Sequence, residues 1–196
     1  MAETAASEAT RLDTGSLLAG RSDGSPRRRM SLTRRGTLAS LSFLALGACA
    51  SAPTPPDTTI YLVRHAEKQA GDNPDLTVVG RARADILSRE LQDAGLTEVW
   101  STDTIRTIET AKPTATRAGL PVQIYDASRQ AAFANRLKAT PGAILVVGHS
   151  NTIPDLVKLL GGKPGAPINE ATEYDRLYVV TVTKGRAKSE LRRYGE

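Results

Sequence analysis

Several residue types are scarce in this chain of 196 residues, and each scarcity excludes a class of protein. One cysteine is present, so no disulfide can form within the chain and the fold does not depend on the redox compartment. The chain has only two histidines, His65 and His149, and it lacks an HExxH spacing, which argues against a zinc site. No apolar run reaches the ~20 residues that a membrane-spanning helix needs. What remains is a globular protein, because 40% hydrophobic residues over this length suffice for one domain with a core.

A strong charge of one sign is also lacking in most of the chain. The formal net charge is +5, but residues 1–48 hold seven arginines against four acidic residues. From Cys49 onward, 19 basic residues face 17 acidic ones, and no Lys/Arg run is interleaved with aromatics. This near balance gives no sign of a surface that binds polyanions, so we expect no nucleic-acid partner.

Residues 1–48 are predicted to be a disordered N-terminus followed by an export signal. Arg34 and Arg35 precede the short apolar segment Leu38–Ala48, and the sequence LGAC ends this segment at Cys49. The paired arginines resemble a twin-arginine signal, and LGAC resembles the lipobox of bacterial lipoproteins. Both resemblances imply an exported protein, periplasmic or on the outer cell surface, that is anchored to a membrane by lipid on Cys49. Met30, just before the signal, is then expected to be the true start.

The chain beyond the signal divides into a tether and one domain. Residues 49–57 contain SAPTPPD, a proline-rich stretch that favours an extended tether. Residues 58–196 are predicted to form the folded domain, and no internal repeat is visible in them.

Short β-rich runs alternate with helical patterns in this domain. Strands are expected at Thr59–Val63, Glu98–Trp100, Val122–Tyr125 and Ala143–Val147, and helices at Thr77–Ala94, Ile105–Arg117, Ser128–Ala139 and Ile153–Leu160. A helix after every strand implies parallel pairing and a sheet covered on both faces. Near the C-terminus, Leu177–Thr183 and Ala187–Tyr194 flank a hairpin-like turn. The predicted fold is therefore α/β, with three layers and a mostly parallel central sheet that has antiparallel edge strands near the C-terminus.

Polar residues follow two of the apolar strands at the point where each strand stops. Arg64 and His65 end the first strand, and His149 follows Gly148 at the end of the fourth. Arg106 falls in the first turn of the helix after the second strand. Ligands of open α/β sheets bind beyond the carboxyl ends of the strands, so we expect these side chains to surround one small volume.

This set of residues suits phosphate chemistry. Guanidinium groups offer paired donors that match phosphate or carboxylate oxygens. A neutral imidazole is a competent nucleophile near pH 7 and can carry a covalent intermediate. Two arginines would repel a metal cation, so neither a metal nor a cofactor is expected.

Three segments resemble, in order, the signatures of the histidine phosphatase superfamily, also called phosphoglycerate mutase-like. They are LVRHA at residues 62–66, STDTIRTIET at 101–110 and VGHS at 147–150. The resemblance implies that His65 is the phosphorylated nucleophile and that Arg64, Arg106 and His149 bind phosphate. Ala66 stands where the family usually has glycine.

The resemblance implies a phosphatase that hydrolyses phosphomonoesters or phosphohistidine through a phosphohistidine intermediate on His65. Its substrate would be a phosphorylated small molecule or a phosphoprotein. The alternatives are a phosphoglycerate mutase-type phosphoryl transfer and a non-catalytic, surface-anchored phosphate-binding module. A carboxyl group is the usual proton donor in this superfamily. Asp126, just after the third strand, is the expected general acid, with Glu67 as its competitor.

Overall fold

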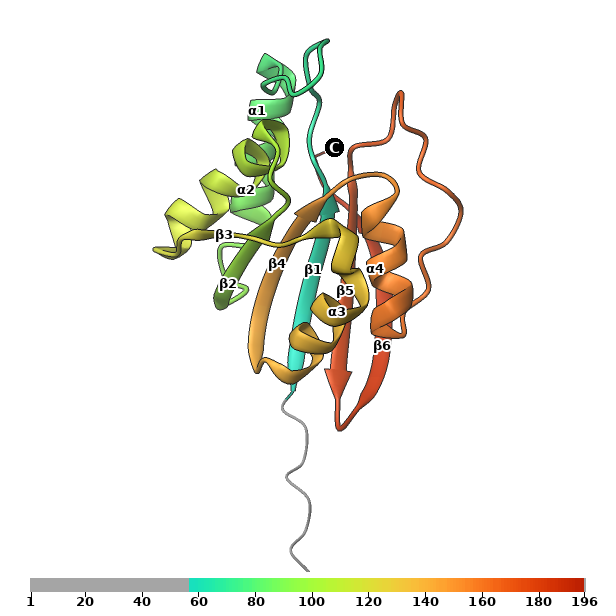
Figure 1. Ribbon diagram of the computed structural model, residues 1–196. Coiled ribbons are helices and arrows are strands. Elements are labelled where there is room, and N and C mark those ends of the chain that lie inside the picture. The colour runs from blue at the N-terminus through green and yellow to red at the C-terminus, as the bar shows by residue number, and fades with distance from the viewer. Residues whose placement is uncertain (1–56, 196) are drawn as a thin grey trace, which may run out of the picture. The chain divides into compact units, whose positions relative to one another are not determined.

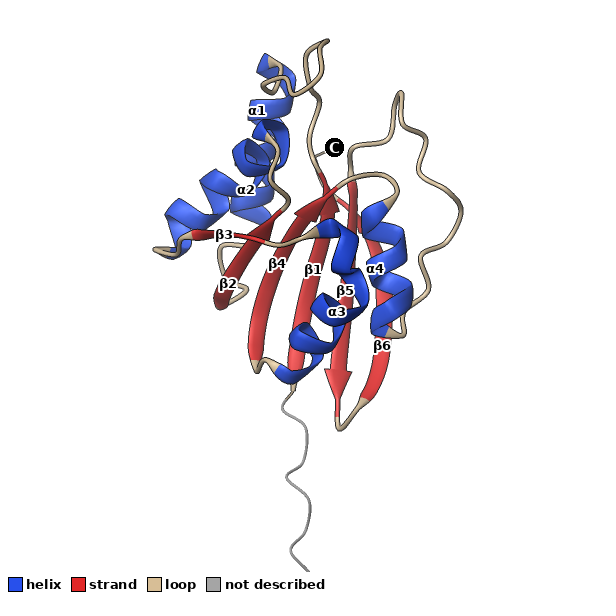
Figure 2. Ribbon diagram, viewed as in Figure 1, coloured by secondary structure: helices blue, strands red, loops and turns tan. Residues whose placement is uncertain are grey.

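The computed structural model describes residues 57–195, and the predicted export signal, Cys49 and the tether up to residue 56 lie outside the described residues. Within residues 57–195, a six-stranded sheet is covered by one pair of helices on each face (Figures 1 and 2). None of the helices in this range is long and apolar enough to cross a bilayer.

The elements alternate along the chain as the sequence pattern predicts. The strands are β1 (Thr58–Arg64), β2 (Leu96–Ser101), β3 (Val122–Ile124), β4 (Gly142–Gly148), β5 (Arg176–Thr183) and β6 (Arg186–Arg193). The helices are α1 (Val78–Glu90), α2 (Ile105–Ala118), α3 (Gln130–Ala139) and α4 (Thr152–Leu160), with a short 3-10 turn, η1, over Ala127–Arg129.

The sheet confirms the predicted fold class. Its strand order is β3-β2-β4-β1-β5-β6. The four strands β3, β2, β4 and β1 pair in parallel, whereas β5 and β6 pair antiparallel at the other side. Because β1 and β4 lie side by side and run the same way, their carboxyl ends meet at one edge of the sheet. That edge is the upper one in Figure 1.

Alternate residues of the central strands fill two apolar layers. On one face, Ile60 and Leu62 of β1 join Leu137 of α3 and Leu156 of α4 in one buried cluster. On the opposite face, Val63 belongs to a second cluster with side chains of α1 and α2. Strands that are buried on both faces have continuous apolar sequences. Burial on each face also fixes the register between neighbouring strands, and this register determines where their ends lie.

The start of α1 is as predicted, but its end is not. Thr77 caps the helix, because its Oγ1 accepts a hydrogen bond of 3.0 Å from the Gly80 N–H. The helix stops at Glu90, whereas the sequence pattern extended it to Ala94. After Glu90, the hydrogen bonds of turns replace the regular hydrogen bonds of an α-helix. The Ala94 N–H, for example, donates to Leu91 O over 3.1 Å. Gly95 then adopts φ +62° and redirects the chain into β2.

The C-terminal hairpin follows the rule for tight β-turns. Lys184 and Gly185 both have positive φ, 51° and 76°, as a type I′ turn requires. The hairpin leaves β6 as an edge strand with most of its residues exposed. Its basic side chains oppose sheet-to-sheet pairing at this edge.

Candidate active site

The two histidines meet where β1 and β4 end. Arg64 lies opposite Gly148 in the register of the two strands, and the His65 N–H donates to Gly148 O over 2.8 Å. The ring centroids of His65 and His149 lie 5.4 Å apart, with the ring planes inclined at 68°. The pairing of two parallel strands is therefore what brings together side chains 84 residues apart in sequence.

One ring nitrogen of His65 is engaged in a hydrogen bond to the backbone. Its Nδ1 lies 2.8 Å from Ala66 O, and a carbonyl oxygen can only accept, so Nδ1 carries the proton. In the neutral ring, Nε2 then bears the lone pair. The residue is 3% exposed, and burial, followed by the charge of Arg64 and the neighbouring His149 and Arg106, lowers its pKa to about 4. The neutral, nucleophilic form of His65 therefore persists well below pH 6.5.

Thr110 connects the loop of His65 to the helix of Arg106. The Thr110 hydroxyl accepts from the Ala66 N–H over 3.0 Å and donates to Arg106 O over 2.7 Å. Gly80 holds the same loop from the other side, because a Cβ there would lie 2.1 Å from Glu67 O. The loop that follows His65 is thus fixed between α1 and α2.

His149 is oriented by a chain of hydroxyl groups. Its Nε2 lies 3.0 Å from Thr102 Oγ1, and the Thr102 hydroxyl donates to Thr107 Oγ1 over 3.0 Å. The Thr102 oxygen then accepts from His149 Nε2–H, which leaves Nδ1 free to take up a proton when an anion binds. Burial, with the charges of Arg106 and Arg64, lowers the pKa of His149 to about 4. The sequence pattern did not predict a role for Thr102 or Thr107.

Arg64 is buried and partly engaged by the loop before β5. Its Nη1 donates to Glu173 O over 3.1 Å, and its Nη2 donates to Glu170 O over 2.9 Å. The guanidinium also lies 4.2 Å from the centre of the Tyr174 ring. Among the described residues, the buried Nε of Arg64 has no hydrogen-bond partner.

Arg106 occupies the first turn of α2 with its guanidinium toward the histidines. Its Nε is also buried without a partner among the described residues. Burial and the nearby charge of Arg64 lower its pKa. A buried donor without a partner costs about 1–3 kcal/mol, and two like charges repel each other. An anion in the pocket that both arginines line would offset the repulsion between their charges.

A pocket of about 460 Å³ contains all four expected phosphate-site residues. Arg64, His65, Arg106 and His149 line it together with Lys68 and Glu170. The Glu170 side chain accepts a hydrogen bond from the Ser150 hydroxyl. This bond, and then the charge of Arg64, lowers the pKa of the Glu170 carboxyl. Glu170 is therefore a carboxylate in the site, and the sequence pattern did not predict it.

Asp126 does not join this group. It is exposed, caps the η1 turn, and accepts hydrogen bonds from the Ser128 N–H at 2.8 Å and from the Ser128 hydroxyl at 2.6 Å. These bonds lower the pKa of Asp126, whereas a general acid needs a raised one. Glu67 is also committed elsewhere, since it forms an ion pair of 2.8 Å with Arg83. Neither position favours the expected role of proton donor.

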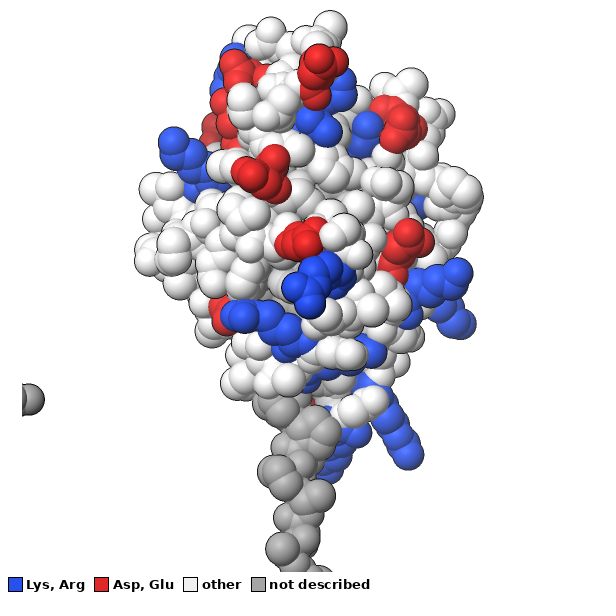
Figure 3. Space-filling model, in the orientation of Figure 1, with Lys and Arg blue, Asp and Glu red and all other residues white. Residues whose placement is uncertain are grey.

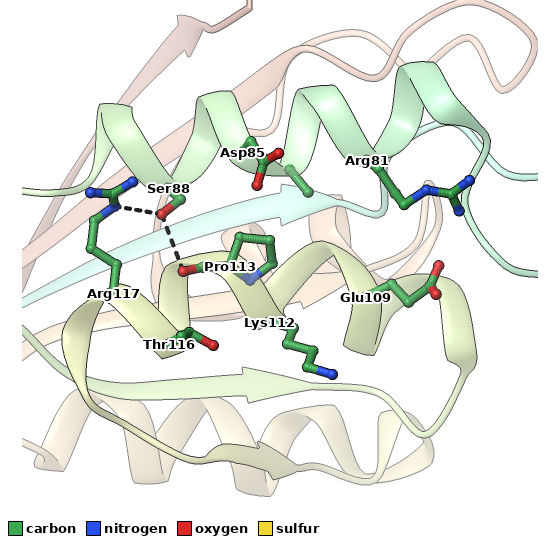
Figure 4. Close-up of a pocket in the computed structure, with 9 residues that line it drawn as sticks. Arg81, Asp85, Ser88, Glu109, Lys112, Pro113, Thr116 and Arg117 are labelled. Atoms are coloured by element: carbon green, nitrogen blue, oxygen red, sulfur yellow. Dashed lines mark hydrogen bonds between the residues drawn. The ribbon is translucent and has the colours of Figure 1, made fainter.

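A second cavity, of about 590 Å³, lies between α1 and α2 and contains no histidine (Figure 4). There, Ser88 Oγ donates to Pro113 O over 3.2 Å and accepts from Arg117 Nε over 2.8 Å. Glu109 lines the same cavity and accepts from the Leu76 N–H over 2.7 Å. The two bonds of Ser88 tie α1 to α2. Both histidines lie in the other pocket.

No group of three or more His, Cys, Asp or Glu residues within residues 57–195 is placed to hold a metal ion.

The lowered pKa values of His65 and His149 predict that the free energy of unfolding decreases as the pH is lowered from 6.5 to 5. In this range the unfolded chain binds protons at both histidines, whereas the folded chain binds few, because its histidine pKa values are about 4. Each histidine should contribute a slope of up to about 1.4 kcal/mol per pH unit. Urea unfolding at a series of pH values measures this, and a His65→Asn/His149→Asn variant should lose the slope. An equal slope in that variant would contradict the lowered pKa values, since the chain has no other histidine.

Comparisons with known proteins agree with this geometry. A family model described as "Histidine phosphatase superfamily (branch 1)" matches residues 60–134, which include His65 and Arg106. A comparison with curated proteins found no match.

Several solved structures share the fold at low sequence identity. Phosphoglycerate mutase from Bacillus anthracis is 15% identical, with a TM-score of 0.57 over 70% of this chain and 93% of that chain. The protein histidine phosphatase SixA, complexed with tungstate, is 17% identical, with a TM-score of 0.56 over 69% of this chain and 96% of that chain. A mycobacterial glucosyl-3-phosphoglycerate phosphatase is 12% identical, with a TM-score of 0.56 over 70% and 98%. The family match thus covers the part of the described domain that holds His65 and Arg106, and the solved structures, all below 25% identity, show that the fold is shared.

Proposed function

We propose that this protein is a phosphatase that hydrolyses phosphomonoesters or phosphohistidine through a covalent phosphate on His65. The observation that carries the proposal is the hydrogen bond from His65 Nδ1 to Ala66 O, in a pocket shared with two arginines. This bond leaves Nε2 as the nucleophile, and the arginines supply donors for the phosphoryl oxygens.

In the first step, His65 Nε2 attacks phosphorus, the P–Nε2 bond forms, and the bond from phosphorus to the leaving group breaks. Negative charge lies on the equatorial oxygens during this transfer. Arg64 and Arg106 both line the pocket, so their guanidinium N–H groups can donate to these oxygens. A bound dianion raises the pKa of His149, which then takes a proton and becomes a further donor.

In the second step, water attacks phosphorus, the P–Nε2 bond breaks, and inorganic phosphate leaves. The attacking water must lose a proton, and an ionised carboxylate can accept it. Glu170 lines the pocket and has a lowered pKa, so it is ionised at neutral pH. We assign Glu170 as the general base of this step. Glu170, and not Asp126, is therefore the carboxyl group that we place in the mechanism.

The charge state of Glu170 also bears on the choice of substrate. An alkoxide leaving group needs a proton from the protein, whereas an aryl ester departs without much help. A phosphorylated imidazole leaves as the neutral ring once its other ring nitrogen is protonated, and solvent can supply that proton near neutral pH. Since Glu170 is ionised and Asp126 lies exposed in a turn, phosphohistidine fits the site better than an alkyl phosphate.

Trapping the intermediate tests the proposal. The wild-type protein, Glu170→Gln and the matched control Asp126→Asn are mixed with phosphate-labelled p-nitrophenyl phosphate or phosphoimidazole and quenched in alkali. We expect an acid-labile, base-stable label on His65. Glu170→Gln should slow the release of inorganic phosphate by about 10²-fold, so label accumulates, and Asp126→Asn should behave as the wild type.

Three outcomes would contradict parts of this scheme. An absence of label on His65 during turnover excludes the covalent mechanism. Transfer of the label to an added sugar-acid phosphate instead of water would indicate a mutase. Equal accumulation in Asp126→Asn and Glu170→Gln would remove the assignment of Glu170.

We further propose that the protein is exported and acylated at Cys49. The support comes from the sequence, where Arg34 and Arg35 precede a short apolar segment that ends in LGAC. The lipid would place the phosphatase domain on a membrane surface, with substrate supplied from the aqueous side.

A further inference from the structure

One end of the described domain carries a cluster of exposed basic side chains, which we call the basic end. It consists of Lys158, Lys163, Lys184, Arg186 and Lys188. Lys184, Arg186 and Lys188 line one surface hollow at the β5–β6 turn. Lys163 lies beside them, because its backbone N–H donates to Ser189 Oγ over 2.8 Å. The cluster is therefore built from two segments that pack against each other.

The basic end lies at the amino end of β1, opposite the histidine pocket. Thr58, the first residue of β1, pairs with Val182, just before the β5–β6 turn. His65 follows the other end of the strand. A strand of seven residues is about 20 Å long, so the pocket and the basic end lie at opposite ends of β1.

Charge is distributed unevenly between the two ends. The basic end contains four of the seven lysines in residues 57–195. Blue side chains dominate the lower end of the domain in Figure 3. Nearby acidic residues are few: Asp57 is exposed at the start of β1, and Glu190 pairs with Arg192 over 2.9 Å. Pairing with carboxylates therefore does not account for this cluster.

Two simpler explanations cover only part of the cluster. Lys158 is in the last turn of α4, where a cation complements the helix dipole. Lys188 lies in the edge strand β6, where charge prevents pairing with another sheet. Neither explanation applies to Lys184, at the tip of the turn, or to Lys163, in the loop after α4.

We propose that the basic end docks on a bilayer surface of anionic phospholipid headgroups. The chain outside the structure gives the direction, because only seven residues, 50–56, separate Cys49 from Asp57. Fully extended, they span at most roughly 30 Å. A lipid on Cys49 would therefore hold the amino end of β1, and with it the basic end, close to the headgroups. The docked domain presents its histidine pocket to the aqueous phase.

Basic residues near an anionic surface strengthen binding in proportion to their number, and salt weakens the effect within a Debye length of about 8 Å at 0.15 M. Neutralising three residues of the basic end should weaken binding by roughly 100-fold.

This inference is independent of the phosphatase proposal, because none of its residues lines the histidine pocket.

Vesicle binding tests the inference with the full chain bearing Cys49→Ala, so that no lipid anchor contributes. Sedimentation with phosphatidylglycerol-containing vesicles is compared between this protein, the triple variant Lys184→Gln/Arg186→Gln/Lys188→Gln and the charge-matched control Arg89→Gln/Lys112→Gln/Arg129→Gln. All three share residues 1–56, so any binding by that segment is common to them.

We expect the basic-end variant to bind roughly 100-fold more weakly than the control, and phosphatidylcholine vesicles to bind neither protein tightly. Equal binding by the two triple variants overturns the proposal. Equal binding to anionic and neutral vesicles also overturns it. Circular dichroism and phosphatase activity, which should be the same in both variants, show that the domain remains folded.

Discussion

Replacing His65 with alanine should lower phosphatase turnover by about 10⁴-fold or more, because the proposed covalent route would lose its nucleophile. The substitution removes both the Nε2 lone pair and the Nδ1 bond to Ala66 O. Steady-state hydrolysis of p-nitrophenyl phosphate measures the loss. Addition of EDTA should leave the wild-type rate unchanged, since no metal takes part in the proposed mechanism.

A matched control separates chemistry from folding. Asp126→Ala removes an exposed side chain that caps a short turn, so turnover should stay near that of the wild type. A His65→Ala protein that is folded by circular dichroism yet keeps more than a tenth of the wild-type rate would exclude His65 as the nucleophile.

Replacing Arg106 with lysine should lower kcat/KM by about 10²–10³-fold although the charge is kept. The planar guanidinium offers several donors in a fixed arrangement, and its Nε is buried in the pocket wall. Lysine offers one compact ammonium group, which cannot donate from the same position. The loss should appear mainly in kcat, because the donors act on charge that develops during the transfer.

Arg129→Lys is the matched control for this substitution, since Arg129 is exposed and outside the pocket. It should leave kcat and KM unchanged. If Arg106→Lys changed only KM, Arg106 would hold the substrate without stabilising the transferring phosphoryl group.

The sequence predicted the part of the site that depends on strand ends. Arg64, His65 and His149 follow the ends of apolar runs. When those runs pair in parallel, the three residues must lie at the same edge of the sheet. The fold class was predictable for the same reason, because each strand is followed by a helical pattern. Residues whose position follows from backbone periodicity were therefore placed correctly.

The remaining part of the site depends on irregular backbone. Glu170 lies in a loop without periodicity, and its place beside Ser150 follows from tertiary contacts. The role of Thr102 likewise depends on how close the end of β2 comes to His149. Asp126 shows the opposite case. It follows a strand end as expected, yet two hydrogen bonds to Ser128 draw its carboxylate into a surface turn.

The contacts of Arg64 limit how many donors it can give to a phosphate without disturbing its own loop. Its Nη1 donates to the carbonyls of Asn169 and Glu173, and its Nη2 donates once, to Glu170 O. One N–H of Nη2 and the Nε–H remain, so a phosphate that takes any further donor from Arg64 must compete with the loop carbonyls. Each such exchange loosens the segment that carries Glu170. Affinity for phosphate and order in this loop are thus opposed, and a tighter loop would give a weaker but faster-releasing site.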